Sequence, residues 1–481
     1  MVLSDNKKDL VEKTNQVQRV FGEVGFQTLV EQYNHDGAFW GQFPANFKYV
    51  ARTRLIPSDV FCHFFPMQNF PTGHTYRTHL GEAMCLVKTP SKTPMFYNYH
   101  AKGSGSKNEK MPAHTTVVGS NNFGKTTEIL VRDSLMEKYD CRLFFFDRNN
   151  GAEIYIEASG GRYINYDFRE EDGIRHNPFA LPDTSANRTF VARLLCAMVR
   201  RPDEKYIDSK ISNQLTECVN HAYNHIPADQ RRLSTAVNIS LEHSFERREE
   251  LYEYMRSDGI RPDGKYAIFF DNQTEGFDFN AYKKFGLDTT KLLKEQKLTG
   301  IITYYVFYLI MMIIEEGDGN PTAIVLDEGW SYLEDPYFAN ELNEALPTLR
   351  KTNTYIVLAT QSASSIINCP IKDKILDNIA TMIIAPNGQA NYEKVYEHLN
   401  ISPSEFNWLK RTPVQTRQAL YIQPQSKDTA IVDLSLKGFD RELAVISGST
   451  ESVMIKRAII EELGTNDPDV WLPEFYKRLG V

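Results

Sequence analysis

One short run of this 481-residue sequence has the residue types and spacing of a phosphate-binding loop. Residues 119–126 read GSNNFGKT and match the pattern GxxxxGK[ST]. The run follows the β-branched residues 115–118 and precedes a helical segment, which is the context that the motif requires. Backbone N–H groups and the helix N-terminus would then surround the phosphates. The predicted nucleotide-binding residues are Gly119, Ser120, Asn121, Asn122, Phe123, Gly124, Lys125, Thr126 and Thr127.

Two side chains of this loop would act on the bound ligand directly. Lys125 would reach the β- and γ-phosphates, and Thr126 would lend its hydroxyl to a magnesium ion. ATP and Mg²⁺ are therefore the predicted cofactors. Phe123 departs from the usual pattern because small residues normally stand there, and Asn121 and Asn122 also replace small residues. These departures leave nucleotide binding as the prediction and put the rate of hydrolysis in question.

A pair of carboxylates forms the second candidate group. Residues 323–326 (AIVL) are apolar, and Asp327 and Glu328 follow them directly. Open α/β sheets bind ligands at the carboxyl ends of their strands. Asp327 would hold magnesium through its water shell, and Glu328 would polarise the attacking water as a general base. The alternative, a solvated acidic turn after a core strand, is weaker once the phosphate-binding loop is considered with it.

Three further residues are candidates for catalysis. Gln361 follows the apolar run 355–359 and could orient water or sense the γ-phosphate; the alternative is an ordinary turn residue. Arg350 ends a helical segment, where a cation interacts favourably with the helix dipole. It is equally a candidate for an arginine finger that reaches the nucleotide of a neighbouring subunit. Arg417 is a second candidate finger, and the sequence does not choose between the two.

These residues must be positioned by a sheet whose strands are buried on both faces. Apolar runs at 142–146, 323–326 and 355–359 alternate with helical segments, which is typical of a parallel α/β sheet. The fold class predicted is an α/β, RecA-like P-loop NTPase core, with an all-helical insertion and a small N-terminal α+β segment. Other predicted strands are 83–88, 95–100, 115–118, 266–270 and 381–385, and predicted helices are 126–138, 287–314 and 340–348.

Four segments are predicted along the chain. Residues 1–105 form the N-terminal α+β segment, and 106–184 form the first part of the ATPase core. Residues 185–262 form the all-helical insertion, because Ile207, Ile211, Leu215 and Val219 recur at helical spacing. Residues 263–481 complete the core and add C-terminal helices.

Composition excludes several classes of site. The net charge of -8 and pI near 5.8 give no basic signature across the chain, so any contact with DNA would have to be local. The 6 cysteines form no CxxC pair, which argues against zinc and against a disulfide framework. The apolar run 301–314 is shorter than the about 20 residues of a bilayer span. A buried helix is predicted there, with a membrane-surface contact as the alternative.

Taken together, blocks of sequence along the chain resemble one family, the conjugation and type IV secretion ATPases of the CagE, TrbE and TraC kind. The similarity covers nearly the whole chain, in order. The blocks are 43–47 (FPANF), 144–166 (FFFDRNNGAEIYIEASGGRYINY), 177–179 (NPF), 286–293 (GLDTTKLL), 326–330 (LDEGW), 349–362 (LRKTNTYIVLATQS), 433–448 (DLSLKGFDRELAVISG) and 471–473 (WLP).

The resemblance implies a P-loop ATPase that transfers phosphoryl groups to water to power pilus assembly, or translocation of protein or DNA, across the bacterial cell envelope. It implies a homo-hexamer, or a lower oligomer in isolation, with Arg350 or Arg417 of one subunit reaching the next subunit's nucleotide. It further implies a cytoplasmic protein held peripherally at the inner membrane, with other inner-membrane components of the apparatus and companion ATPases as partners. Residues 1–105 would be the remnant or the end of the family's N-terminal domain.

Two other functions stay open from the sequence. One is a DNA-translocating ATPase of the HerA and FtsK kind, which shares the same core and whose hydrolysis DNA would stimulate with a steep salt dependence. The other is a nucleotide-binding scaffold with little turnover, for which Phe123 is the main argument.

Overall fold

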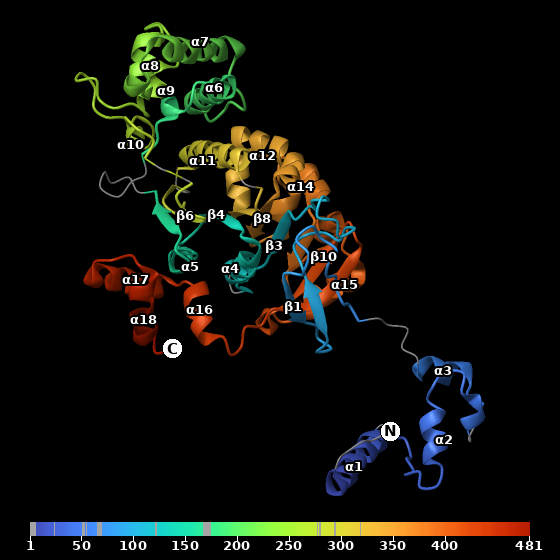
Figure 1. Cartoon of the computed structure of the whole chain (residues 1–481). Helices are drawn as coiled ribbons and strands as arrows, with labels where there is room; N and C mark the ends of the chain where they lie inside the picture. The colour runs from blue at the N-terminus through green and yellow to red at the C-terminus, as the bar shows by residue number, and fades with distance from the viewer. Residues whose placement is uncertain are drawn as a thin grey trace. The chain divides into compact units, whose positions relative to one another are not determined.

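The computed structural model divides by its internal contacts into two units, Met1–Asn69 and Phe70–Val481. The second unit contains the sheet and every residue for which a nucleotide-binding or catalytic role is predicted (Figure 1). The structure describes residues 6–23, 25–50, 53, 55–64, 70–120, 123–166, 175–276, 278, 280–292, 295–317 and 319–481. Asn121 and Asn122 of the phosphate-binding loop therefore lie outside the described residues.

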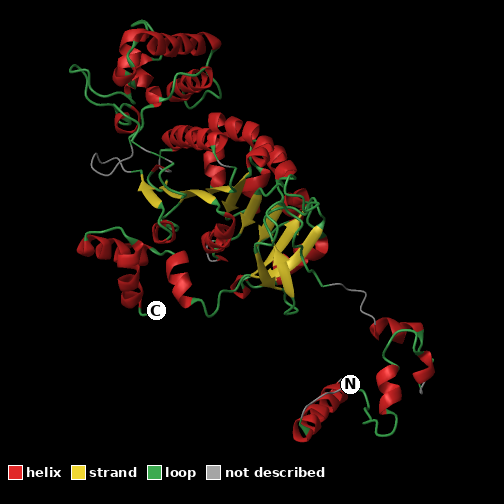
Figure 2. Cartoon of the chain, in the orientation of Figure 1, coloured by secondary structure: helices red, strands yellow, loops and turns green. Residues whose placement is uncertain are grey.

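Within the described part of the second unit, an 11-stranded sheet has the order β2-β1-β11-β10-β9-β3-β8-β7-β4-β6-β5 (Figure 2). From β9 to β5 every strand is parallel to its neighbours, and the remaining strands continue the sheet in antiparallel pairs. The parallel strands are β9 (Thr381–Ile384), β3 (Thr115–Val118), β8 (Thr354–Thr360), β7 (Thr322–Leu326), β4 (Arg142–Asp147), β6 (Lys284–Asp288) and β5 (Arg162–Asn165). The antiparallel strands are β10 (Gln418–Gln423), β11 (Asp428–Asp433), β1 (Cys85–Lys88) and β2 (Pro94–Tyr97).

The central parallel strands are buried along their length because helices cover both faces of the sheet. Every residue of β3, β7 and β8 is buried. Side chains of a strand alternate between the two faces, so Phe144 and Phe146 pack into one hydrophobic core and Leu143 and Phe145 into the other. The α/β, RecA-like fold class predicted from the sequence is therefore correct.

Helices from distant parts of the chain form the two covering layers. One face carries α11 (Gln296–Glu316), α12 (Pro336–Leu349), α13 (Ala363–Ile367), α14 (Lys372–Asn378) and α15 (Pro403–Arg411). The other carries α4 (Lys125–Met136), α5 (Glu153–Ala158), α16 (Asp440–Ile446), α17 (Thr450–Leu463) and α18 (Pro468–Leu479). In Figure 1 the labels α11 and α12 lie above the sheet, and α4, α5 and α16 lie below it.

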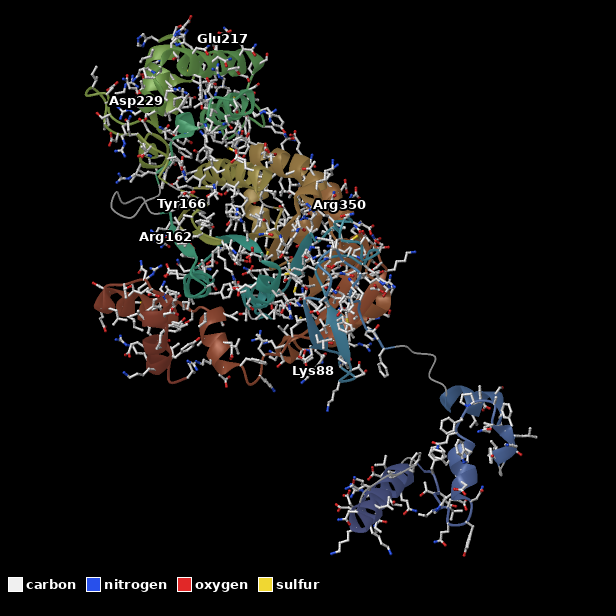
Figure 3. All side chains as sticks on the ribbon, viewed as in Figure 1. Lys88, Arg162, Tyr166, Glu217, Asp229 and Arg350 are labelled. Carbon is white, nitrogen blue, oxygen red and sulfur yellow. The ribbon has the colours of Figure 1, made fainter. Side chains whose placement is uncertain are left out.

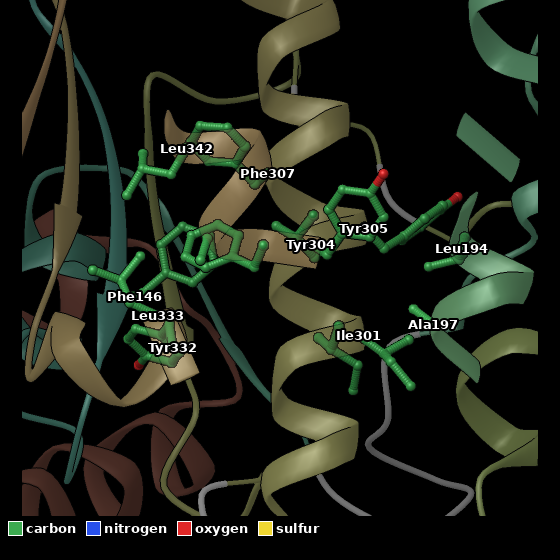
Figure 4. Packing of buried hydrophobic residues seen from close by; sticks show 14 of the residues in the cluster. Phe146, Leu194, Ala197, Ile301, Tyr304, Tyr305, Phe307, Tyr332, Leu333 and Leu342 are labelled. Atoms are coloured by element: carbon green, nitrogen blue, oxygen red, sulfur yellow. The ribbon is translucent and has the colours of Figure 1, made fainter. Parts of the chain in front are cut away.

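Helix α11 lies between the sheet and a separate helical block. By length and composition alone it could cross a membrane, but 72% of its most apolar window is buried inside the protein. Figure 4 shows Ile301 and Tyr304 of this helix between Phe146 of β4 and Leu194 of the block. The structure therefore agrees with the prediction of a buried helix for residues 301–314.

The block itself is built from α6 (Ser185–Val199), α7 (Ser209–His225), α8 (Leu233–Ser240) and α9 (Arg248–Tyr252). The chain segments that enter and leave this block meet where Glu275 contacts His176 and Asn177. That carboxylate lies 2.6 Å from Nδ1 of His176 and accepts hydrogen bonds from the N–H of Asn177 (2.9 Å) and the hydroxyl of Tyr305 in α11 (2.7 Å). Figure 3 shows Glu217 and Asp229 on this block, whereas Arg162 and Tyr166 lie nearer the sheet.

Two predicted elements are wrong in this region. Residues 266–270 were expected to form a strand, but they contain the short helix α10 (Ala267–Phe270). Residues 287–314 were expected to form one helix, but Leu287 belongs to β6 and α11 begins only at Gln296. Short apolar runs do not distinguish a buried strand from a buried helix, so both errors arise from the same ambiguity.

A buried ion pair attaches the C-terminal helices to the core. Lys456 of α17 is 1% exposed, and its Nζ lies 2.7 Å from Oε1 of Glu153 in α5. The neighbouring Arg457 donates two hydrogen bonds to the same carboxylate, of 2.8 and 2.5 Å. Helix α17 is thereby held against the segment that directly follows β4.

The first unit contains α1 (Lys7–Glu23), α2 (His35–Trp40) and α3 (Ser58–Phe64). No residue of α1 is buried. The rings of Phe39, Trp40 and Phe43 contact one another, with centroids 5.1 to 5.8 Å apart. The four segments predicted along the chain stay a prediction; β1 and β2, which fall within predicted segment 1–105, belong to the sheet of the second unit.

Candidate nucleotide-binding site

The phosphate-binding loop connects β3 to α4, as the sequence predicts. The N–H of Gly119 donates to the carbonyl of Thr360 (3.0 Å), which fixes the start of the loop to the end of β8. Gly124 has φ of 86° and directly precedes the first residue of α4. Only glycine adopts this left-handed conformation without strain, so the turn into the helix depends on it.

The side chain of Phe123 packs into the hydrophobic core. Its ring is 4% exposed and belongs to the core cluster that also contains Val117 and Ala385. A Cβ on Gly119 would lie 2.8 Å from Cδ1 of this ring, which is closer than real Cβ contacts, so the bulky residue and the glycine fit each other. The departure from small residues at this position is thus accommodated by the core.

Lys125 lies between the loop and the carboxylate pair. Its Nζ donates to the carbonyl of Gly119 (3.0 Å) and lies 3.7 Å from Oε1 of Glu328. Burial lowers the pKa of Lys125, and the charge of Glu328 opposes that effect. A phosphate oxygen would offer this ammonium a charged acceptor in place of a carbonyl, which is a stronger interaction.

Asp327 and Glu328 stand at the carboxyl end of β7. The N–H of Asp327 donates to the carbonyl of Phe146 (3.0 Å), so the residue continues the pairing of β7 with β4. Burial and the neighbouring charge of Glu328 raise the pKa of Asp327 to about 6. Glu328 has φ of 53°, a left-handed conformation that is uncommon for a residue with a side chain and that often marks functional sites.

The other predicted catalytic residues are found in three different places. Gln361 is exposed and follows β8, whose last residue Thr360 pairs with Val118 at the start of the loop, so it lies at the nucleotide-binding edge of the sheet. Arg350 is exposed and precedes β8, so it lies at the opposite edge of the sheet; Figure 3 labels it at the outside of the molecule.

Arg417 contacts the phosphate-binding loop of its own chain. Its Nη1 donates to the carbonyl of Phe123 and lies 3.2 Å from the position that a Cβ on Gly124 would take. The residue directly precedes β10, and no local pattern in the sequence places it next to residues 119–126. Within one subunit the structure therefore brings together the loop, Asp327, Glu328, Gln361 and Arg417, and it does not bring Arg350 to them.

A cavity of about 960 Å³ opens beside the loop. Phe123, Gly124 and Thr127 line it on one side. Leu434, Ser435, Leu436 and Lys437 of the segment between β11 and α16, and Asp440 at the start of α16, also line it. Ligand pockets in proteins have volumes of about 300–1,000 Å³, so this cavity can receive the nucleoside part of a nucleotide whose phosphates lie on the loop.

Asp147 is a further acidic residue at this site that the sequence did not single out. It ends β4, next to β7, and it is fully buried. Its Oδ2 accepts hydrogen bonds from the hydroxyl of Tyr163 (2.6 Å) and the N–H of Ala152 (2.8 Å). Burial raises its pKa to about 8, opposed by these two hydrogen bonds. The sequence pattern that could have indicated Asp147 is an apolar strand that ends in aspartate, FFFD.

The side chains present fit a magnesium ion that is bound mainly by phosphate oxygens and water. Among the described residues, no group of three or more His, Cys, Asp or Glu side chains could hold a metal ion by itself. Magnesium in nucleotide sites is usually held by one or two carboxylates together with the phosphates. The hydroxyl of Thr126 and the buried carboxylate of Asp327 are suitable donors, and when bound the ion would neutralise charge on the phosphates.

Comparison with protein families agrees with this geometry. Residues 111–411 match the family described as the TraG P-loop domain. Residues 1–52 match the CagE, TrbE, VirB family, a component of type IV transporter systems.

Individual proteins are similar along nearly the whole chain. The chain is 28% identical over 493 residues to the type IV secretion system protein virB4 of Brucella abortus, covering 99% of this chain and 58% of that protein. It is 26% identical over 488 residues to PtlC of Bordetella pertussis, again covering 99% of this chain and 58% of that protein. The chain thus spans 58% of the length of these relatives.

A solved structure shares the fold. VirB4 of Thermoanaerobacter pseudethanolicus superposes with a TM-score of 0.58 at 13% identity, covering 78% of this chain and 100% of that chain.

Proposed function

Because this chain belongs to the TraG P-loop domain family, we propose that it binds Mg-ATP at residues 119–126 and hydrolyses it as the motor of a type IV secretion or conjugation system. The similarity to virB4 and PtlC, which are secretion-system proteins, favours this function over that of a DNA-pumping motor of the HerA and FtsK kind. Pilus assembly or the translocation of a protein or DNA substrate would be the work performed.

One observation carries the proposal that ATP is hydrolysed. The ammonium of Lys125 and the carboxylate of Glu328 lie 3.7 Å apart, with Asp327 buried beside them, at the edge of the sheet where the loop opens. Lys125 binds the β- and γ-phosphates, and Thr126 and Asp327 hold magnesium. Once Lys125 engages phosphate, Glu328 is released to accept a proton from the attacking water.

Arg417 and Gln361 complete the site within the subunit. The guanidinium of Arg417 contacts the loop carbonyl of Phe123, so it can bind a phosphate or ribose oxygen of the same subunit's nucleotide. Gln361 follows the strand next to β3 and can orient water at the γ-phosphate. Arg350 remains the candidate for a finger that acts on a neighbouring subunit, because it lies at the opposite edge of its own sheet.

Membership of the family supports a proposal for assembly and location. We propose a ring of identical subunits, a homo-hexamer, held peripherally at the cytoplasmic face of the bacterial inner membrane. Other inner-membrane components of the secretion apparatus and companion ATPases would be its partners.

ATP turnover of variants tests the proposed function. Glu328→Gln keeps nucleotide binding and lowers turnover by about 10²- to 10⁴-fold, as expected for the loss of a general base. Lys125→Ala loses both binding and turnover, because it removes the buried cation at the phosphates. Purified protein is assayed with Mg-ATP, and Lys374→Ala, an exposed lysine on α14, is the matched control and keeps full turnover. Equal turnover in all forms would exclude hydrolysis at this site; nucleotide binding without turnover in the unaltered protein would identify the scaffold function instead.

A further inference from the structure

Three neighbouring strands of the sheet end in aspartate. Asp327 follows β7, Asp147 ends β4 and Asp288 ends β6, and the order of the strands is β7, β4, β6. Asp147 and Asp288 are direct partners in the parallel register, and Phe146 is paired with Leu326 one position before. The three carboxylates therefore stand in a row at the nucleotide-binding edge, and Asp147 is the middle one.

The carboxylates of Asp288 and Asp147 in this row have different environments. At Asp288, Oδ1 accepts hydrogen bonds from the N–H (3.0 Å) and the hydroxyl of Thr290, so this carboxylate caps its own turn. At Asp147, Oδ2 accepts from Tyr163 and Ala152, whereas Oδ1 is buried and has no hydrogen-bond partner among the described residues. A buried carboxylate oxygen without a partner is costly, so it requires an explanation.

The unpartnered oxygen faces the same space as Thr126. A Cβ on Gly151 would lie 3.6 Å from Oδ1 of Asp147 and 3.3 Å from Cγ2 of Thr126. Gly151 has no side chain, so this small volume between the two residues stays open. Thr126 belongs to the first turn of α4, and its methyl carbon is the atom nearest to Gly151. The motif assigns the hydroxyl of the same side chain to magnesium.

We propose that Asp147 is a second positioning carboxylate of the magnesium site, with Oδ1 accepting hydrogen bonds from the water shell of the ion that accompanies the nucleotide. The inference rests on the proposed function, because it requires Mg-nucleotide at residues 119–126. Asp327 and Asp147 then hold the hydrated ion from two adjacent strands. Such outer carboxylates typically change metal affinity by about 10- to 100-fold.

The substitution Asp147→Asn separates this role from a purely structural one. The donors Tyr163 and Ala152 require an acceptor, so the amide oxygen takes the place of Oδ2 and the NH₂ group takes the place of Oδ1. The turn between β4 and α5 keeps its hydrogen bonds, but the group that faces the ion becomes a donor. Asp288→Asn is the matched control, because it makes the same change one strand away, where Thr290 already engages the carboxylate.

The experiment measures the affinity of the full chain for a fluorescent ADP analogue, with Mg²⁺ and with EDTA. The unaltered protein binds more tightly with Mg²⁺, and the ratio of the two affinities is the readout. Asp147→Asn lowers this ratio by about 10-fold and leaves the affinity in EDTA unchanged. Asp288→Asn leaves both affinities unchanged.

Three other results are possible, and each would contradict either the inference or the proposed function. An unchanged ratio in Asp147→Asn overturns the inference and leaves the proposed function standing. Equal losses with Mg²⁺ and with EDTA assign Asp147 a structural role only, which also overturns it. Absence of nucleotide binding by the unaltered protein overturns the proposed function itself.

A second variant tests the same space without altering the carboxylate. Gly151→Ala places a methyl group between Thr126 and Asp147, in a backbone conformation that alanine can adopt. It is expected to lower the Mg²⁺-dependent ratio and to leave the affinity in EDTA unchanged. If Asp147→Asn does not fold, an unchanged ratio in Gly151→Ala rejects the proposal.

Discussion

Two cations contact carbonyl groups of the phosphate-binding loop from different parts of the chain. Lys125 donates to Gly119, and Arg417 donates to Phe123. The role of Lys125 could be predicted because the motif fixes both its position and its neighbours. The contact of Arg417 could not be, because it depends on how β10 joins the sheet beside β9, which no local pattern states.

Substitution of the two candidate arginines distinguishes a role within one subunit from a role between subunits. Arg417→Ala is expected to weaken ATP affinity by about 10-fold in dilute monomer, the effect of losing one charge-assisted hydrogen bond of about 1.5 kcal/mol. Arg350→Ala is expected to leave that affinity unchanged and to lower turnover only where the protein self-associates. Affinity and turnover are measured together with particle size, with and without nucleotide.

Two results would contradict these assignments. Weaker binding by monomeric Arg350→Ala would place that residue at its own subunit's nucleotide. A protein that stays monomeric under all conditions would leave a finger between subunits without a target.

At the scale of elements, continuous burial made some strands predictable and others not. The strands β3, β7 and β8 are buried without interruption and consist of threonine and hydrophobic residues, so their positions were predicted correctly. Strand β6 was missed because Lys284 and Gly286 interrupt its apolar run. In the structure Nζ of Lys284 lies 2.8 Å from Oδ2 of Asp133, a distant residue that compensates the buried charge. Such pairing across the fold cannot be read from a single segment.

The attachment of α17 to α5 gives a prediction about stability. Lys456→Met removes the buried cation beside Glu153, whose carboxylate keeps the half-exposed Arg457 and the side-chain amide of Asn150 as donors. Removing one member of a buried ion pair costs up to about 3–5 kcal/mol of unfolding free energy. Urea unfolding measures the loss. Lys477→Met is the matched control, because that lysine is 78% exposed and its variant should unfold like the unaltered protein. Equal stability of the two variants would show that the buried pair does not hold α17.

At the scale of the whole molecule, buried histidines connect stability to pH. Burial lowers the pKa of His100 to about 3 and that of His114 to about 4. Both recover an ordinary pKa of about 6.5 when the chain unfolds. Below about pH 6.5 the unfolded state binds more protons than the folded state. The contribution of these histidines to the free energy of unfolding is therefore fully present above about pH 6.5 and is lost as the pH falls toward about 4.

The free energy of unfolding is expected to fall by about 1.4 kcal/mol per pH unit for each histidine as the pH decreases through that range. Urea unfolding at several pH values between 7.5 and 5 measures it. His100→Phe keeps a ring of similar shape near His79 and Tyr355, whose centroids lie 5.2 and 5.6 Å from that of His100, and should reduce the slope by one histidine's share. His398→Gln alters an exposed side chain and should not change it. An unchanged slope in His100→Phe would contradict the assignment.

The contacts of α17 also define a mechanical path through the molecule. Lys456 forms an ion pair with Glu153 of α5, and α5 follows the turn that begins after Asp147 and contains Gly151. A Cβ on Gly448, just before α17, would lie 2.7 Å from the carbonyl oxygen of Gly151, so the two backbones are in direct contact. A pulling force on the C-terminal helices is therefore expected to act on this turn, which borders the proposed magnesium position. Coupling between two sites is reciprocal, so a ligand that stabilises this turn would also oppose displacement of the C-terminal helices. Mechanical load on these helices and nucleotide binding would therefore affect each other.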